Sequence, residues 1–223
     1  PLRRGSSNYL NLRKEDMNIT RLSAAAAIVA ATLGLAACGS DEPEQPTEAS
    51  DQPTVDLEAA PENASWSSVG GIGTPVDSND GPEKTNPVPH GYSHTPQGAV
   101  QAAINGQVML ATADDQTWPD VASDMTSPGP GRDQWAQGRS LISVNGSVDK
   151  KDAAEFKGFK ITNYNDDKAQ VLLAADYPDV GLTVYPVQLV WQADDWKLVL
   201  PDQENAPDLH KLESLDGFTE YAQ

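Results

Sequence analysis

The chain has 223 residues, enough for one domain of ordinary size with tails or for two small domains, and one domain is the better expectation. Five of its 15 Lys and Arg residues but only two of its 33 Asp and Glu residues precede the single cysteine, Cys38, so the chain after it carries a formal charge of about −21. This charge repels nucleic-acid phosphates, so nucleic acid is excluded as an expected partner. One cysteine cannot form an intramolecular disulfide, so any extracytoplasmic fold must rely on its core.

The segment from Met17 has the pattern of an export signal. A short polar start with Arg21 leads into an uncharged run over residues 22–37. This run is shorter than the roughly 20 apolar residues that span a bilayer, and it is rich in alanine, so a signal peptide over residues 17–37 is favoured over a permanent transmembrane anchor. We interpret residues 1–16, which precede this start, as a non-native upstream segment and exclude them from the fold.

The only cysteine closes a four-residue motif, Leu35-Ala36-Ala37-Cys38. The motif resembles the lipobox of bacterial lipoproteins at every position. The resemblance implies that the Cys38 sulfur receives a diacylglycerol and that the signal peptide is cleaved before it. Two or three acyl chains hold a protein durably on a membrane, whereas one binds only marginally. We therefore expect a protein anchored by lipid to the outer face of the cytoplasmic membrane.

Residues 38–64 are acidic and rich in Pro, Ser and Thr, with eight Asp and Glu and no Lys or Arg. Such a segment cannot bury enough apolar surface to offset the entropy of ordering, and its like charges extend it. We expect a disordered tether that spans on the order of 30 Å.

Three helices are expected after the tether. Thr95 is a candidate N-cap and Pro96 suits the first helical position. Gly106 weakens this helix by roughly 1 kcal/mol relative to alanine, so we expect a neighbour to pack closely against it. The residues that recur at three- and four-residue steps predict one apolar face: Ala99, Val100, Ala103, Ile104, Val108 and Ala111.

The second and third helices are shorter. A helix over residues 118–125 is expected to begin through Thr117 and Pro119. After the break at residues 127–131, Asp133 is predicted to cap a third helix that continues to Leu141.

The C-terminal half changes to a β pattern. Four β-rich runs, at residues 156–164, 169–177, 182–191 and 196–200, are separated by short turns. Short turns join antiparallel neighbours, so the sequence predicts a four-stranded meander. Pro186 lacks a ladder donor and implies an edge position or a bulge that curls the sheet. Alternation assigns these residues to the core face: Phe159, Ile161, Val171, Leu173, Ala175, Tyr177, Tyr185, Val187, Leu189, Trp191, Trp196, Leu198 and Leu200.

The expected fold class is α+β, with N-terminal helices packed on a curved antiparallel four-stranded meander. Helices followed by a meander that ends in DDWKLVLP, residues 194–201, resemble the cone-shaped fold of the nuclear transport factor two family. The resemblance covers roughly residues 95–201. We expect the cone-like domain to extend over residues 95–203 and residues 204–223 to form a C-terminal tail.

The segment from Trp66 to Ala99 contains Trp66, Pro75, Gly81-Pro82, Gly91-Tyr92, His94-Thr95-Pro96 and Gly98-Ala99. With these residues it resembles a family of uncharacterised actinobacterial exported proteins and lipoproteins, some of them associated with mobile genetic elements. The resemblance implies that residues 65–94 form an extended arm packed on the domain, with Trp66 as its packing knob, and it supplies no catalytic residues.

The residues with chemical potential form no catalytic or metal-binding pattern. His90 and His94 are four apart, but Pro and Gly place them in a loop, so no metal is expected and His94 should pack or hydrogen-bond beside the Thr95 cap. The residues GYSHT, 91–95, lack the context of a nucleophile elbow. The aspartate pairs 166–167 and 194–195 lie in expected hairpin turns, where solvated aspartate is favoured.

Five aromatic residues are candidates for a pocket or an interface, although Trp at such spacings is mostly core. They are Trp118, Trp135, Tyr185, Trp191 and Trp196.

The sequence therefore favours a lipid-anchored, non-enzymatic extracytoplasmic domain without a cofactor. Its expected partner is a protein of an envelope or conjugation-type assembly, and the membrane is bound through the lipid at Cys38. The alternative is a small-ligand carrier or sensor that uses the interior of the cone. An enzyme with Asp or His as proton carrier has the least support, because the expected inward positions are nearly all apolar.

Overall fold

The computed structural model describes residues 55–221, which belong to one compact unit. The expected upstream segment, the signal peptide, Cys38 and most of the tether lie outside the described residues.

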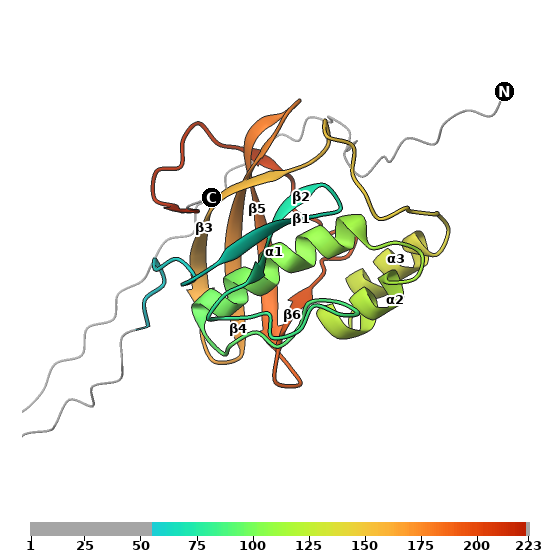
Figure 1. The fold of residues 1–223 in the computed structure, drawn as a ribbon, viewed down its shortest axis with the longest axis horizontal. Helices are drawn as coiled ribbons and strands as arrows, with labels where there is room; N and C mark the ends of the chain where they lie inside the picture. Colours follow the sequence, from blue (N-terminus) through green and yellow to red (C-terminus); the bar gives the residue numbers. More distant parts are fainter. Residues whose placement is uncertain (1–54, 222–223) are drawn as a thin grey trace, which may run out of the picture. The chain divides into compact units, whose positions relative to one another are not determined.

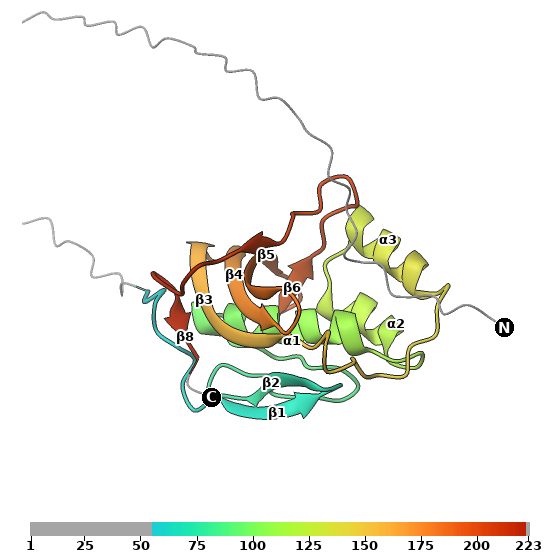
Figure 2. The ribbon, with the colours of Figure 1, turned by 90° about the horizontal axis from the view of Figure 1, so that it is seen from above.

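The described residues form an α+β fold in which one helix lies between a hairpin and a larger sheet (Figure 2). The hairpin consists of β1 (Ser65–Val69) and β2 (Ile72–Asp77), and the central helix is α1 (Pro96–Thr112). At one end of α1 lie α2 (Trp118–Asp120), the π-helical turn η1 (Val121–Met125) and α3 (Pro130–Arg139) (Figure 1).

The sheet is antiparallel and has the strand order β6-β5-β4-β3-β8, with β7 paired to β5. It is therefore larger than the predicted four strands, because two short strands come from the segment expected to be a tail. The strands are β3 (Glu155–Tyr164), β4 (Lys168–Tyr177), β5 (Gly181–Trp191), β6 (Trp196–Val199), β7 (His210–Lys211) and β8 (Thr219–Glu220).

The start of α1 is confirmed. The Thr95 hydroxyl accepts a hydrogen bond from the Gly98 amide at 2.9 Å, and Pro96 occupies the first turn. Five of the six residues assigned to the apolar face are buried, and Ala111 is exposed. Burial extends beyond that face, because every residue from Gly98 to Gly106 is buried. A helix covered on two sides by protein buries most of its circumference, including polar positions.

Gly106 packs closely against the sheet, as expected. A Cβ atom at this position would lie 2.3 Å from Cδ1 of Leu198 on β6. The missing side chain therefore lets the helix backbone settle onto the sheet.

The predicted alternation of the strands agrees with the core. Nine of the assigned residues are buried, and Tyr177, Tyr185, Trp191 and Leu200 are partly buried against the same cluster. The register shifts lie in β3, at Phe156/Gly158 and Ile161/Asn163, and not at Pro186. Pro186 faces β4 at Leu172. On its other side β6 pairs only with residues 188–191 and β7 only with residues 183–184, so Pro186 has the predicted edge position.

Residues 65–94 do not form a single extended arm. Residues 65–77 fold back as the hairpin β1–β2, whose two-residue turn is Gly70-Gly71 with φ values of 57° and 93°. Glycine adopts these left-handed conformations without a steric penalty, which makes a tight turn possible. Only residues 78–94 connect the hairpin to α1 as a loop.

The third helix begins earlier than predicted. It starts at Pro130, and Gly129 occupies the N-cap position, so Asp133 lies inside the first turn and is not the cap. The helix ends at Arg139, which leaves Leu141 outside it. Proline at the first helical position, where its missing N–H has no intrahelical partner, explains the earlier start.

Candidate functional site

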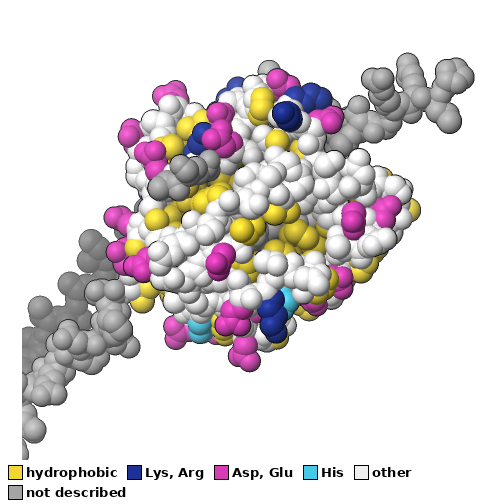
Figure 3. Space-filling model, viewed as in Figure 1, with side chains coloured by type: hydrophobic (Ala, Val, Ile, Leu, Met, Phe, Trp, Pro, Cys, Tyr) yellow, Lys and Arg dark blue, Asp and Glu magenta, His cyan; other side chains and the backbone are white. Residues whose placement is uncertain are grey.

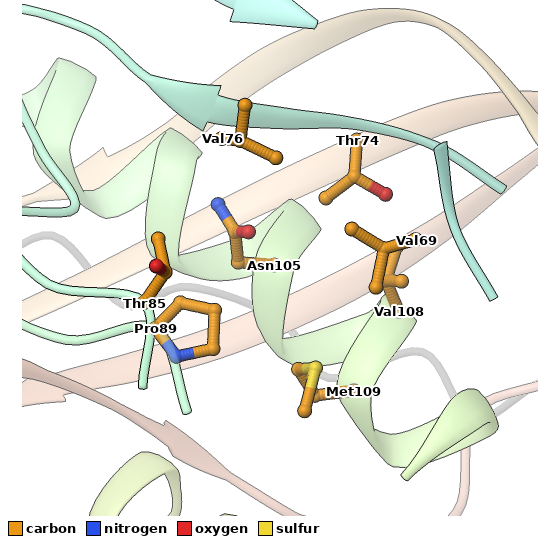
Figure 4. Close-up of a pocket in the computed structure, with 8 residues that line it drawn as sticks. All are labelled: Val69, Thr74, Val76, Thr85, Pro89, Asn105, Val108 and Met109. Carbon is orange, nitrogen blue, oxygen red and sulfur yellow. The ribbon is translucent and has the colours of Figure 1, made fainter. Parts of the chain in front are cut away.

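Two cavities lie along the side of α1 that faces the hairpin. The first has a volume of about 100 Å³ and lies between α1, β2 and the loop before α1 (Figure 4). Asn105 stands at its centre, and its Nδ2 donates to the Pro75 carbonyl at 2.9 Å and to the Gln101 carbonyl at 3.0 Å. Its other walls are mainly apolar, and hydrophobic side chains are visible in hollows on this face of the molecule (Figure 3).

The second cavity is larger, about 270 Å³, and has no charged side chain in its wall. Gln101 of α1 lines it and is only 1% exposed, and Tyr221, which follows β8, is also a lining residue. Gln101 Oε1 and the Tyr221 hydroxyl are both buried and have no hydrogen-bond partner among the described residues. Burial also raises the pKa of Tyr221 well above its usual value. The remaining lining residues are Ala60, Pro61, Asn63, Ala64 and Trp66.

The outer wall of the second cavity, residues 56–64, is fastened to three parts of the fold. Gln97 Nε2 of α1 donates to the carbonyls of Asp56, at 2.9 Å, and Ala59, at 3.0 Å. The Thr219 hydroxyl of β8 donates to the Glu58 carbonyl at 2.7 Å, and the Asn79 amide donates to the Glu62 carbonyl at 3.0 Å. The wall is therefore held in place by tertiary contacts.

His94, Trp191 and Trp196 form an aromatic cluster at the hairpin between β5 and β6. The His94 ring stacks on Trp191 with centroids 4.0 Å apart and planes 9° apart, and it meets the edge of Trp196 at 5.7 Å. The Trp196 indole donates to the Ser93 carbonyl at 3.0 Å. This confirms that His94 packs beside the Thr95 cap, and Trp196 itself is a core residue at 1% exposure.

Asp195 corrects the expectation of a solvated turn. The side chain is buried and accepts hydrogen bonds from the amides of Gly91 at 3.1 Å, Tyr92 at 2.9 Å and Trp196 at 3.0 Å. Lys197 Nζ lies 3.1 Å from its Oδ2. The carboxylate thus joins the loop before α1 to the β5–β6 hairpin. The pKa of Tyr92 is raised by burial first and by the charge of Asp195 second.

The five aromatic candidates occupy three separate places. Trp118 and Trp135 meet edge to face at 6.4 Å beside a small second core under α2 and α3. Trp191 and Trp196 belong to the cluster with His94. Tyr185 packs on the main core, where burial and the neighbouring Tyr177 raise its pKa. The structure therefore does not bring the five residues together in one pocket.

The turn after α3 exposes two aliphatic side chains, Leu141 at 81% and Ile142 at 47%. Arg139, which is buried, holds this turn. Its Nη1 donates to the Ile142 carbonyl at 2.8 Å, and its Nη2 donates to Asp115 Oδ1 at 2.8 Å and to the Ala113 carbonyl at 3.1 Å. The exposed pair is thus presented by a fixed turn.

Asp115 completes this arrangement from the loop after α1. Its Oδ1 accepts from the Val144 amide at 3.0 Å, and this bond, together with those from Arg139 and Ser143, lowers its pKa to about 2. The adjacent Asp114 also has a lowered pKa, because the hydroxyl and amide of Thr117 and the amide of Gln116 donate to it.

Residues 55–221 contain neither a cluster of metal-ligating side chains nor a membrane-spanning helix. No group of three or more His, Cys, Asp and Glu side chains is arranged there so that it could hold a metal ion. In the same range, no helix has the length and apolar character needed to cross a bilayer.

The two buried amides of α1 were missed by sequence analysis. Gln101 and Asn105 are four residues apart, a spacing that places both on one side of a helix. Two amide side chains inside the otherwise apolar stretch of residues 98–106 indicate that a second element, with polar groups of its own, packs against this side of the helix. The identity of that element, the hairpin, depended on the Gly70-Gly71 turn.

The described residues form a single α+β domain. Its central helix α1 lies between an antiparallel sheet and a hairpin, and two cavities border the helix on the hairpin side. The chain belongs to the family described as a domain of unknown function, DUF8175, whose model matches residues 29–220. A search of curated proteins and a search of solved structures found no match.

Proposed function

We propose that this protein is a lipid-anchored, non-enzymatic extracytoplasmic domain that binds a protein partner in an envelope or conjugation-type assembly. In this proposal Cys38 carries the lipid, the following acidic residues form the tether, and the domain stands on the outer face of the cytoplasmic membrane. The lipobox resemblance supports the anchor, and the surface of the domain supports the binding role.

The exposed pair Leu141 and Ile142 is the observation that carries the binding role. Arg139 fixes the backbone of this turn through the Ile142 carbonyl, so the turn loses little backbone freedom on binding, and a partner meets two aliphatic side chains at defined positions. Burial of these side chains against a partner removes apolar surface from water, which favours association.

The surroundings of this pair indicate the chemistry of the partner. The segment of residues 114–133, which Arg139 joins to the turn through Asp115, contains five Asp residues and a single base, Arg132. Complementary charge steers association and fixes orientation more than it adds affinity. The partner we propose therefore offers an apolar pocket for Leu141 with basic side chains at its rim.

The contacts of His94 and Asp195, the candidate proton carriers, favour a non-enzymatic role. His94 is stacked on Trp191 and its Nε2 contacts the Asp166 carbonyl at 2.5 Å, while Asp195 is saturated by three amides and Lys197. Both side chains connect parts of the fold.

We also propose that the domain has the cone-like fold and that it is related to actinobacterial exported proteins. The antiparallel sheet with two register shifts in β3, wrapped against α1, supports a curved sheet of that type. Buried side chains fill the interface between α1 and the sheet, which favours partner binding at the surface over a ligand in the cone interior.

Site-specific photocrosslinking in cells that produce the full-length lipoprotein tests the binding role. A photoreactive residue at position 141 should give a discrete adduct with one protein. Ile142→Asp should abolish this adduct, because a charge inside the apolar contact is costly to desolvate.

Val180 provides the matched control, since it is an exposed aliphatic residue in the turn between β4 and β5. A photoreactive residue there should give no such adduct. Equal adducts from both positions, or none from position 141, would contradict the proposal.

A further inference from the structure

We propose that Asn145, in the loop between α3 and β3, is a site of spontaneous deamidation, and that its isoaspartyl product releases this loop from the turn of the hairpin β1–β2. The chain contains two Asn-Gly pairs, Asn145-Gly146 and Asn105-Gly106. In such a pair the glycine nitrogen can attack the asparagine side chain, because no Cβ on the following residue stands in the way. The fold places one pair in an exposed loop and the other inside α1, so it separates a reactive pair from a protected one.

The loop leaves the attacking nitrogen free. Asn145 is exposed, and Gly146 has a φ of 82°, a left-handed conformation that glycine adopts without a steric penalty. The Gly146 amide donates no hydrogen bond to any of residues 55–221. Its nitrogen is therefore available as a nucleophile.

The hydrogen bonds of Asn145 turn its side-chain carbonyl toward the backbone that follows. Its Oδ1 accepts from the Ser147 amide at 3.2 Å and from the Ser147 hydroxyl at 3.0 Å. A bond to the amide two residues further on folds the asparagine side chain over the peptide group between Asn145 and Gly146. The same two donors stabilise the negative charge that develops on Oδ1 when the side-chain carbon is attacked.

The reaction consumes one water molecule and releases one ammonia molecule. Hydroxide takes the proton of the Gly146 amide, the nitrogen forms a bond to Cγ of Asn145, and the bond from Cγ to Nδ2 breaks as ammonia leaves with a proton from water. Water then opens the resulting succinimide ring. Cleavage between the glycine nitrogen and Cγ gives aspartate, whereas cleavage between this nitrogen and the main-chain carbonyl carbon gives isoaspartate, whose backbone runs through Cβ and Cγ.

Asn105 meets none of these conditions. It is 2% exposed, and its Nδ2 donates to the carbonyls of Pro75 at 2.9 Å and Gln101 at 3.0 Å. The Cβ atoms of a helix point toward its N-terminus, so the side chain of Asn105 is directed away from the Gly106 amide. Deamidation at this position requires α1 to open first.

Isoaspartate at position 145 lengthens the main chain by one carbon where the loop packs closely on the hairpin. The Val148 amide donates to the Gly70 carbonyl at 2.9 Å, and a Cβ atom on Gly70 would lie 2.8 Å from the Gly146 carbonyl oxygen. The added carbon displaces both contacts. Ordinary aspartate keeps the length of the backbone, and its carboxylate accepts the same bonds from Ser147.

Peptide mapping by mass spectrometry, with the full-length protein incubated in mildly alkaline buffer, tests the reaction. Asn145 should become aspartate and isoaspartate, whereas Asn105 should react more slowly by a factor on the order of 100 or more while the protein is folded. In urea the two pairs should react at comparable rates. Asn145→Gln is the matched control and should show no mass change at this position, because its longer side chain cannot form the five-membered ring.

Hydrogen exchange of the Val148 amide tests the release of the loop. In the isoaspartyl form, separated by chromatography, this amide should exchange about tenfold faster or more than in the unreacted protein, because its bond to Gly70 is lost. In Asn145→Asp, which has the charge but not the longer backbone, its exchange rate should equal that of the unreacted protein.

Three results would overturn the proposal. If Asn145 kept its amide in the folded protein and lost it in urea, the bonds from Ser147 would protect the side chain and not activate it. Equal rates at Asn105 and Asn145 in the folded protein would contradict the role of the fold. An unchanged exchange rate of the Val148 amide in the isoaspartyl form would contradict the release of the loop.

Discussion

The two sides of α1 differ in how completely they are packed. Toward the sheet, Gly106 meets Leu198 directly, and the buried side chains of helix and strands form one apolar cluster. Toward the hairpin, the same helix presents Gln101 and Asn105 and borders two cavities. One helix thus has a side that stabilises the fold and a side with polar groups and space for an occupant.

This difference indicates that the contacts between α1 and the sheet tolerate changes in side-chain volume less well than the contacts between α1 and the hairpin. Side chains on the sheet side fill the space between two continuous surfaces, whereas the hairpin has only two strands and covers α1 incompletely. Substitutions on the two sides should therefore have different costs in the free energy of unfolding.

The largest effect is expected on the sheet side, at Leu198. This residue is 2% exposed and packs against Gly106, so Leu198→Ala should lower the free energy of unfolding by about 2–5 kcal/mol. Urea unfolding followed by tryptophan fluorescence measures it. A loss below about 1 kcal/mol would mean that this side is not the tightly packed one.

Gly106→Ala should lower the free energy of unfolding by about 1–3 kcal/mol despite the higher helix propensity of alanine, because the new Cβ collides with Leu198. Combined with Leu198→Ala, the same substitution should cost much less, since the collision is removed. Additive losses in this double-mutant cycle would refute the direct contact.

Asn105→Leu, on the hairpin side, should cost about 1 kcal/mol. The substitution leaves the Pro75 carbonyl without its donor, but the adjoining cavity relieves part of the crowding. Gln107→Leu is the control on the same helix and should change stability by less than about 0.5 kcal/mol. A cost for Asn105→Leu as large as that of Leu198→Ala would remove the distinction between the two sides.

The smallest effect concerns the turn after α3, in acid. The contacts of Asp115 lower its pKa to about 2, so its carboxylate stabilises the folded turn fully above the unfolded-state pKa of about 3.9. This stabilisation is lost as the pH falls through about 2. The amides of Leu141 and Ile142 should therefore become better protected from hydrogen exchange, relative to their intrinsic exchange rates, as the pH rises from 2 to 5. Asp115→Asn should abolish this change. Protection that is the same in both proteins would contradict the assignment.

Periodicity in the sequence was sufficient to place α1, the four longer strands and most of the core. Alternation identified Val171, Leu173 and Leu189 as buried because each strand has one face against the helix. The N-cap Thr95 and the close packing at Gly106 could also be predicted, because each depends on residues near in sequence or on one neighbouring element.

The features of the candidate site required contacts between distant segments. Asp195 is buried only because the loop at Gly91 and Tyr92 supplies amide donors, and aspartate in a turn carries no sign of such a partner. Likewise, the 270 Å³ cavity arises where Trp66, Gln101 and Tyr221, each from a different element, approach one another. The Gly70-Gly71 turn could have indicated the hairpin, but not the space beneath it.

Mass spectrometry of the protein purified from its own membranes tests the central claim, a binding domain held at the membrane by lipid. We expect the mature chain to begin at Cys38 and to carry the mass of a diacylglycerol on its sulfur. Cys38→Ala should remove this mass and release the domain from the membrane fraction. A mature protein with an unmodified Cys38 thiol, or one that stays in the cytosol, would contradict the account.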